Sequence, residues 1–216
     1  MKIIELEILT DDLEATARFY NGTLGFPFLG STPQTRVFSI GDSILTFRKS
    51  ENQHPVYHFA FNIPHDKLYE SLEWISQKVD PLFLPEGGHV ADFSSWNANA
   101  FYFKDNNGNI LEFIARYDIA VKENKPFDDQ SILSISEIGI VVKDPLSFAN
   151  DLVVNQNLNY FVKSKPAEEF VVLGNDDGLF IIVSHQRPWY PTSTPARSFP
   201  IKVTVMQNEL IKTFQF

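Results

Sequence analysis

The chain has 216 residues and a formal net charge of −9, from 27 acidic and 18 basic side chains, and it contains no cysteine. These values exclude a disulfide scaffold and a thiolate metal site, and the acidic balance argues against a broad nucleic-acid surface, which needs clustered Lys and Arg. Apolar residues make up 44% of the chain, but no apolar run approaches the roughly 18 residues of a spanning helix, so we expect a folded protein that does not act at a membrane.

The N-terminal sequence MKIIELEILTDD lacks a basic region before a long apolar stretch. It is therefore not typical of a signal peptide, and we expect a cytoplasmic protein. Residues Ile3–Leu9 alternate as a strand, with Glu5 and Glu7 on one face and aliphatic side chains on the other. Asp12 is the expected N-cap of a helix that ends before Gly25. The Gly41-Asp42 pair predicts a hairpin between the strands Arg36–Ile40 and Ser43–Arg48.

The same order of elements then restarts. A strand is expected first, then an amphipathic helix, then three strands. The predicted ranges are Val56–Ile63 for the first strand, Asp66–Val79 for the helix, and Pro81–Pro85, Ala100–Lys104 and Asn109–Arg116 for the three strands.

A polar stretch, residues 119–131, is a predicted linker, and the order begins a third time after it. Asp144 caps the expected helix, which runs through Leu152 and has Pro145 at its first position. A helical turn is expected at the C-terminus. The predicted strands are Ile132–Val142, Asn159–Lys163, Phe170–Leu173, Leu179–Ser184 and Ile201–Met206.

These restarts indicate an internal repeat. Aligning Glu5 with Glu137 also aligns Asp12 with Asp144, which preserves a seven-residue step. The repeat predicts three domain segments: residues 1–118 hold two complete modules, 119–131 are the linker, and 132–216 hold a third module and a truncated fourth. We expect the C-terminal segment to complete a sheet, cover an edge or form a subunit contact.

Three stretches resemble the vicinal oxygen chelate superfamily, which contains glyoxalase I, fosfomycin-resistance proteins, bleomycin-binding proteins and extradiol dioxygenases. They are ELEILTDDLEATARFYNGTLGF (Glu5–Phe26), HFAFNI (His58–Ile63) and FYFKDNNGNILEFI (Phe101–Ile114). The resemblance covers residues 1–117 and implies an α+β fold in which paired βαβββ modules form a cupped mixed sheet. A third module and a truncated fourth follow.

The resemblance also implies a metal site on the first and last strands of each module. Carried onto this chain, its positions are Glu5, His58 and Glu112, with Thr46 at the fourth position. Family members usually have His or Gln where Glu5 stands. Burying an unpaired carboxylate costs several kcal/mol, and a shared cation would offset that cost. A hydrogen-bonded core histidine is the competing interpretation of His58, and a carboxylate paired with a basic side chain is that of Glu5.

Other residues are candidates for the pocket. Glu7 is the candidate general base, with a solvated or salt-bridged carboxylate as the alternative. Arg48 is either an anchor for an anionic group or a surface residue, and Trp96 either stacks on a substrate or packs at a rim. Thr46 and Tyr102 are expected to line the pocket. Glu137 is expected to be structural, because the last-strand position of its module falls near Ile181, which cannot bind a metal.

The resemblance and the residues together predict an enzyme that uses one divalent metal ion to stabilise an enolate or oxyanion of an oxygen-bearing small molecule, by isomerase, lyase or related chemistry. Mn, Zn, Co, Ni, Mg and Fe are not distinguished. One alternative is a metal-free binding or resistance protein similar to bleomycin-binding proteins. A third hypothesis is an Fe(II) extradiol-type dioxygenase, whose chemistry commonly uses two His and one carboxylate. The expected partner is a small molecule, and the resemblance implies a homodimer.

Overall fold

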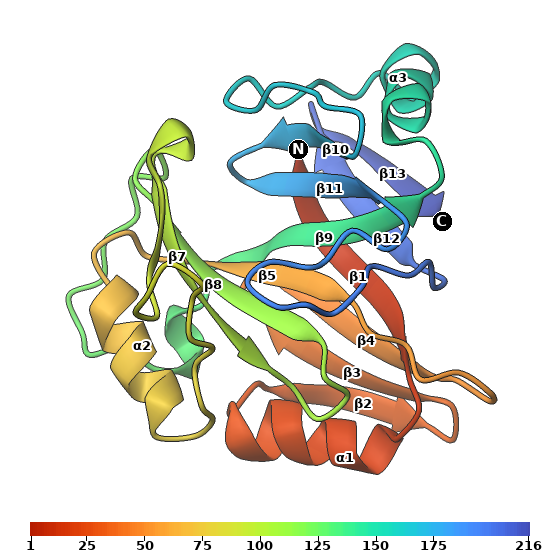
Figure 1. Cartoon of the computed structure of the whole chain (residues 1–216). Helices are drawn as coiled ribbons and strands as arrows, with labels where there is room; N and C mark the ends of the chain where they lie inside the picture. Colours follow the sequence, from red (N-terminus) through yellow and green to blue (C-terminus); the bar gives the residue numbers. More distant parts are fainter.

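The computed structural model describes all residues from 1 to 216 and contains two mixed β-sheets with short helices (Figure 1). The first βαβββ module follows the expected order. Asp12 accepts hydrogen bonds from the backbone N–H groups of Glu14 and Ala15, which fixes the start of the helix. The elements of this module are β1 (Lys2–Thr10), α1 (Leu13–Ala17), a π-helical turn (Arg18–Thr23), β2 (Phe28–Thr32), β3 (Thr35–Ile40) and β4 (Ser43–Lys49).

The second module differs from the expectation at one strand. Residues Pro81–Pro85 form a loop, and the short strand of this position lies later in the chain, at Ala91–Phe93. The elements are β5 (His58–Ile63), α2 (Leu68–Ser76), β6 (Ala91–Phe93), a 3₁₀ turn (Ser94–Trp96), β7 (Ala98–Lys104) and β8 (Ile110–Arg116).

The C-terminal segment contains a third module and a hairpin. In place of the predicted strand Asn159–Lys163 there is a single bridge between Tyr160 and Leu173. The predicted C-terminal helical turn is wrong: Asn208 and Glu209 both have positive φ, as a two-residue hairpin turn requires, and a strand follows. The elements are a 3₁₀ turn (Asp129–Ser131), β9 (Ser134–Val142), α3 (Pro145–Gln156), β10 (Phe170–Asn175), β11 (Gly178–Ser184), β12 (Lys202–Gln207) and β13 (Leu210–Gln215).

The strands form two sheets, and each sheet combines an N-terminal with a C-terminal part of the chain. The β1 sheet has the order β13-β12-β1-β4-β3-β2, and the β5 sheet has the order β10-β11-β9-β5-β8-β7-β6. The first two modules therefore lie in different sheets: β1 pairs with β12, and β5 pairs with β9. The α+β fold of paired modules is confirmed. Module one and module two were expected to share a sheet, but each of them shares its sheet with C-terminal strands instead.

Alternation along each strand separates a core face from an open face. In β5, Phe59, Phe61 and Ile63 belong to a hydrophobic core that the two sheets share with α1, α2 and α3. The opposite face of β5 carries His58, Ala60 and Asn62. In Figure 1 the blue segment that joins β11 to β12, residues 185–201, passes in front of β5 and β9. None of the helices is both long and apolar enough to cross a membrane.

Candidate metal centre

Three buried metal-binding side chains meet on the open face of the β5 sheet. Glu112 on β8 and Glu137 on β9 are both paired with Ala60, from opposite sides of β5. His58 lies two residues before Ala60 and therefore shares its face. One ligand atom from each of His58, Glu112 and Glu137 lies within 4.8 Å of the others. The sheet register therefore builds this cluster, which we call the His/Glu/Glu centre.

The orientation of the His58 ring leaves one nitrogen free. Nδ1 lies 3.0 Å from the carbonyl oxygen of Ile110, which can only accept, so Nδ1 carries the proton. Burial lowers the pKa of His58 to about 4, so the ring is neutral at physiological pH. Nε2 then presents a lone pair toward Glu112 Oε2 at 3.6 Å. Because two acceptors face each other, this contact needs a cation or a proton between them.

The two carboxylates are both buried, with 3% of each residue exposed. Burial, together with the charge of Glu137, raises the pKa of Glu112 well above its ordinary value. Burial also raises the pKa of Glu137, and the neighbouring Arg116 guanidinium opposes that shift. Glu137 is thus paired with a cation in the protein, whereas no Lys or Arg forms a salt bridge with Glu112, whose one such contact is with the neutral His58.

Arg116 connects the centre to the surface through a line of charges. Its guanidinium, which is fully buried, binds Glu137 and lies 3.5 Å from Asp176 Oδ1. Asp176 in turn accepts from Lys163 Nζ at 2.7 Å. On the other side, Ser136 Oγ lies 3.3 Å from Arg116 Nε, at a register shift in β9 between Ile135 and Glu137. Such irregularities redirect side chains, and here Ser136 and Glu137 both reach Arg116.

The centre lies at the bottom of a cavity of about 270 Å³. Its other walls are mainly aromatic. Trp189, from the segment between β11 and β12, packs so closely on β9 that a Cβ on Gly139 would lie 2.4 Å from its ring. Burial raises the pKa of Tyr102 well above its usual value, with the Glu112 and Glu137 charges adding to the shift, so this hydroxyl remains a donor. The remaining lining residues are Phe93, Trp96, Phe170, Ile181, Arg187 and Tyr190.

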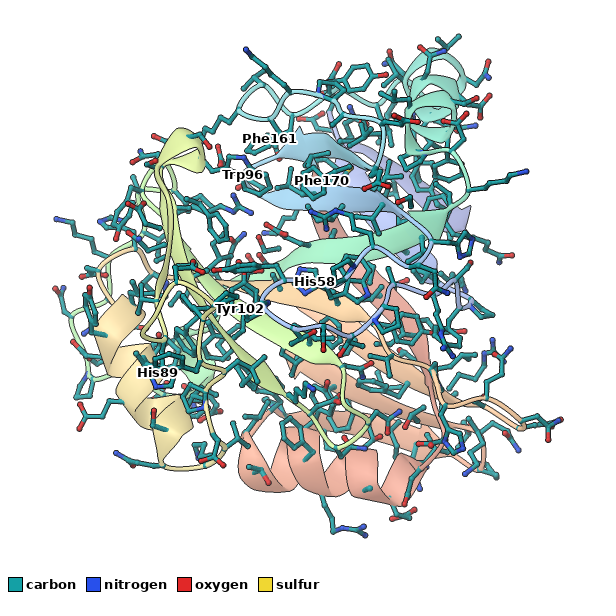
Figure 2. All side chains as sticks on the ribbon, in the orientation of Figure 1. His58, His89, Trp96, Tyr102, Phe161 and Phe170 are labelled. Carbon is teal, nitrogen blue, oxygen red and sulfur yellow. The ribbon has the colours of Figure 1, made fainter.

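Two of the predicted pocket residues line this cavity. Figure 2 shows Trp96 beside Phe161 and Phe170, and Tyr102 close to His58. The rings of His58 and Tyr102 are 6.3 Å apart, and those of Trp96 and Phe161 are 5.1 Å apart. His89 lies near α2 in the same view, where its ring hydrogen-bonds the carbonyl of Leu82, and it does not line the cavity.

The remaining predicted site residues lie on the β1 sheet, away from the His/Glu/Glu centre. Glu5 accepts a hydrogen bond from Thr204 Oγ1 at 3.2 Å, and Glu7 pairs with Arg48 Nε at 3.1 Å. Thr46 stands opposite Glu7 on β4. Glu5, Glu7 and Thr46 line a separate depression on this sheet, in which β1 pairs with β4 and β12 rather than with β5. The structure therefore does not bring Glu5 to His58 and Glu112.

The residues that sequence reasoning missed include Glu137, Arg187 and Trp189, which line the cavity, and Arg116, which binds Glu137. Glu137, expected to be structural, occupies the place in the cluster that Glu5 was expected to fill. The alignment of Glu5 with Glu137 marks the two as equivalent positions, so the signal is present in the sequence. Arg116, Arg187 and Trp189 have no comparable signal, because a basic or aromatic residue in a strand end or a proline-rich loop has no motif.

The donor set fits a divalent cation. An imidazole nitrogen and two carboxylates are ligands for Zn²⁺, Mn²⁺, Co²⁺ and Fe²⁺. A ligating histidine usually donates its other N–H to a carbonyl or carboxylate, as His58 does to Ile110. Ile181 lies at the position that the repeat assigns to a fourth strand ligand, and it lines the cavity without a donor atom. The protein thus offers three ligands and leaves room for others.

The sequence profile of the Glyoxalase/Bleomycin resistance protein/Dioxygenase superfamily matches residues 2–113. The chain therefore belongs to this superfamily, as its motifs indicated. No match was found among curated proteins.

A solved structure shares the fold over nearly the whole chain. A candidate dioxygenase from Bacillus subtilis subsp. subtilis str. 168 is 17% identical, with a TM-score of 0.63 over 97% of this chain and 71% of that chain. A lactoylglutathione lyase from Agrobacterium tumefaciens is 20% identical, with a TM-score of 0.41 over 51% of this chain and 90% of that one. The oxidase ChaP-H2 is 20% identical, with a TM-score of 0.43 over 54% of this chain and 94% of that one.

Proposed function

We propose that this protein is a divalent-metal-dependent enzyme of the glyoxalase-like group and that His58, Glu112 and Glu137 hold its metal. The proposal rests chiefly on one observation: the neutral His58 Nε2 faces Glu112 Oε2 at 3.6 Å while the other ring nitrogen donates to Ile110. Leaving a buried acceptor pair unsatisfied costs free energy, and a shared cation removes that cost in the metal-loaded protein, as a proton on Glu112, whose pKa is raised, would in the metal-free protein. The family membership supports the same conclusion.

A metal in this position supplies a Lewis acid that polarises a substrate oxygen and stabilises negative charge on it. The residues of the chain prepare the cavity for that chemistry. Tyr102 holds a protonated hydroxyl beside Glu112, where it can donate to a substrate oxygen. Tyr190 donates a hydrogen bond from its hydroxyl to Glu86, and burial raises the pKa of this hydroxyl, so Tyr190 does not act as a base. Trp189 lines the cavity and packs on β9 at Gly139.

This arrangement favours a reaction in which charge develops on an oxygen, such as isomerisation, lyase chemistry or addition to an activated bond. The proposed substrate is an oxygen-bearing small molecule. Glu7, the base predicted from sequence, lies on the other sheet in an ion pair with Arg48. We therefore do not place it in the reaction, and proton transfer is left to groups that line the cavity.

Metal content tests the proposal directly. Protein purified without chelator, and without a tag that leaches nickel, is titrated anaerobically with Mn²⁺, Fe²⁺, Co²⁺, Ni²⁺ and Zn²⁺ and then analysed for bound metal. We expect about one equivalent in the wild type and loss of that equivalent in His58→Ala, Glu112→Gln and Glu137→Gln. Glu5→Gln is the matched control and should retain the metal. The absence of binding for every ion, or loss only in Glu5→Gln, would overturn the proposal.

A metal-free binding protein is the second candidate, because most of the cavity wall is aromatic. In that case a planar ligand would bind to the protein without any metal, and the three substitutions would leave its affinity unchanged. The dioxygenase alternative needs Fe²⁺, and only one histidine is in the cluster, whereas such sites commonly use two histidines and one carboxylate. A selective response to Fe²⁺ in the same titration would favour it.

A further inference from the structure

One cation in the cavity wall has no partner in the protein. Arg187 lies in the segment between β11 and β12, lines the cavity and is partly buried. Its guanidinium forms no salt bridge and no hydrogen bond, although five N–H donors are available on this group. Its one defined contact is with the Phe170 ring, whose centroid lies 4.9 Å from Cζ. A partly desolvated guanidinium of this kind is stabilised by an anion.

A second donor in the same cavity also lacks an acceptor. Trp189 is two residues further along the chain, 3% of it is exposed, and its indole Nε1 is buried without a hydrogen-bond partner. Its ring lies 5.2 Å from that of His58. A buried donor with no acceptor costs about 1–3 kcal/mol. Arg187 thus offers a donor group without a partner at the cavity wall, and Trp189 carries a second one beside His58.

The size and walls of the cavity limit the ligand that these donors would meet. A volume of about 270 Å³ is just below the range of roughly 300–1,000 Å³ for small-molecule sites, which suits a ligand with one ring. Aromatic rings stack or pack edge to face at about 4.5–7 Å between centroids. Trp96, Phe170 and Tyr190 offer such faces around the opening. The cavity therefore combines flat aromatic side chains with one cationic donor, Arg187.

We propose that the substrate is a single-ring aromatic carboxylate and that Arg187 is the residue that selects it, by binding the carboxylate. The ring lies between the aromatic walls, and another oxygen of the molecule reaches the His/Glu/Glu centre. This inference rests on the proposed function in treating the ligand as the substrate of that centre.

A pair of isosteric probes tests the selection. The affinities of 3- and 4-hydroxybenzoate are compared with those of 3- and 4-hydroxybenzamide by calorimetry, using metal-loaded full-length protein. A hydrogen bond to a charged group is worth about 1.5–3 kcal/mol, or roughly 10- to 150-fold in affinity. We expect the wild type to prefer at least one carboxylate by about 10-fold or more over its amide. Arg187→Gln should abolish that preference, and Arg187→Lys should retain part of it.

Arg197→Gln is the matched control, because Arg197 is an exposed arginine of the same segment. This variant should keep the wild-type preference. Three results would each overturn the inference. The wild type could bind acid and amide equally, both acids could fail to bind when added at about 10-fold excess over protein at roughly millimolar concentration, or Arg187→Gln could keep the wild-type preference. Metal content is measured in the same samples: retained metal without acid selection contradicts only the role of Arg187, whereas acid selection without metal contradicts only the proposed metal enzyme.

Discussion

Glu112 and Glu137 stand opposite each other across one strand, because β8 and β9 flank β5 and both residues are paired with Ala60. The side chain of Ala60 is small and leaves the space between the two carboxylates open, and His58 borders this space on the same face of β5. The register of three neighbouring strands therefore defines the centre. Glu112 has no cationic partner, and Glu137 has Arg116, so the two carboxylates should respond differently to substitution.

Glu112→Gln should make the metal-free protein more stable at neutral pH. The pKa of Glu112 in the folded protein is raised above its ordinary 4.5, so its favourable contribution is present below that pH and is lost as the pH rises through the folded-state pKa. We expect a gain in metal-free melting temperature at pH 7, on the scale of about 2–4 °C per kcal/mol. Differential scanning calorimetry from pH 5 to pH 8 measures it.

The same variant should lose the response to metal. Added Mn²⁺ or Zn²⁺ stabilises a protein that binds it only when folded, so the wild type should melt higher with metal and Glu112→Gln should not. His58 contributes a slope of opposite sign: because its pKa is lowered to about 4, its contribution is full above pH 6.5 and declines as the pH falls toward 4. A metal-free Glu112→Gln protein that is less stable than the wild type at pH 7 would contradict the buried-charge account.

Arg116→Met should destabilise the protein strongly. The guanidinium is fully buried and pairs with Glu137, and removing one partner of a buried ion pair typically costs about 3–5 kcal/mol. The double variant Arg116→Met/Glu137→Gln should recover part of this loss, because position 137 then no longer holds a buried carboxylate without its cation. Urea unfolding of the single and double variants measures the coupling. Arg197→Met on the surface should change stability by less than about 0.5 kcal/mol, and equal losses in the single and double variants would argue against the pair.

Gly139→Ala should displace the Trp189 ring from its packing position against β9. An added Cβ would lie 2.4 Å from the Trp189 ring, and overpacking of this kind costs about 1–3 kcal/mol. We expect a lower melting temperature and a red shift of tryptophan emission as the indole becomes exposed. Gly22→Ala is the control, since nothing lies within 4 Å of its Cβ position. Unchanged emission in Gly139→Ala would show that Trp189 does not depend on this contact.

The sequence is sufficient to predict the local parts of this site. Alternation in β5 and β8 is a property of neighbouring residues, so it assigns His58 and Glu112 to the face of each strand that lies opposite the aromatic core side chains. Asp12 and Asp144 are predictable as caps for the same reason, and both accept backbone hydrogen bonds at helix starts. The family motifs then indicate the module fold.

The pairing between modules is not predictable in this way. Whether β5 lies beside β1 or β9 depends on contacts between residues far apart in the chain, and both candidates carry a glutamate at the equivalent position. The choice between Glu5 and Glu137 is therefore a choice of sheet partner. The roles of Arg116 and Arg187 are not predictable from sequence, because each depends on contacts with residues that are distant in the chain or on the cavity that the fold creates. The C-terminal strand escapes prediction because an Asn-Glu turn gives a weak hairpin signal.

The position of the metal is the most direct test of this account. Crystals of the wild-type protein, grown with the ion that binds most tightly in the titration, are measured at the absorption edge of that metal. We predict one anomalous peak about 2.0–2.3 Å from His58 Nε2 and from a carboxylate oxygen of Glu112 and of Glu137. A peak beside Glu5 and Glu7 on the β1 sheet, or a metal-soaked crystal with no peak between the three residues, would contradict it.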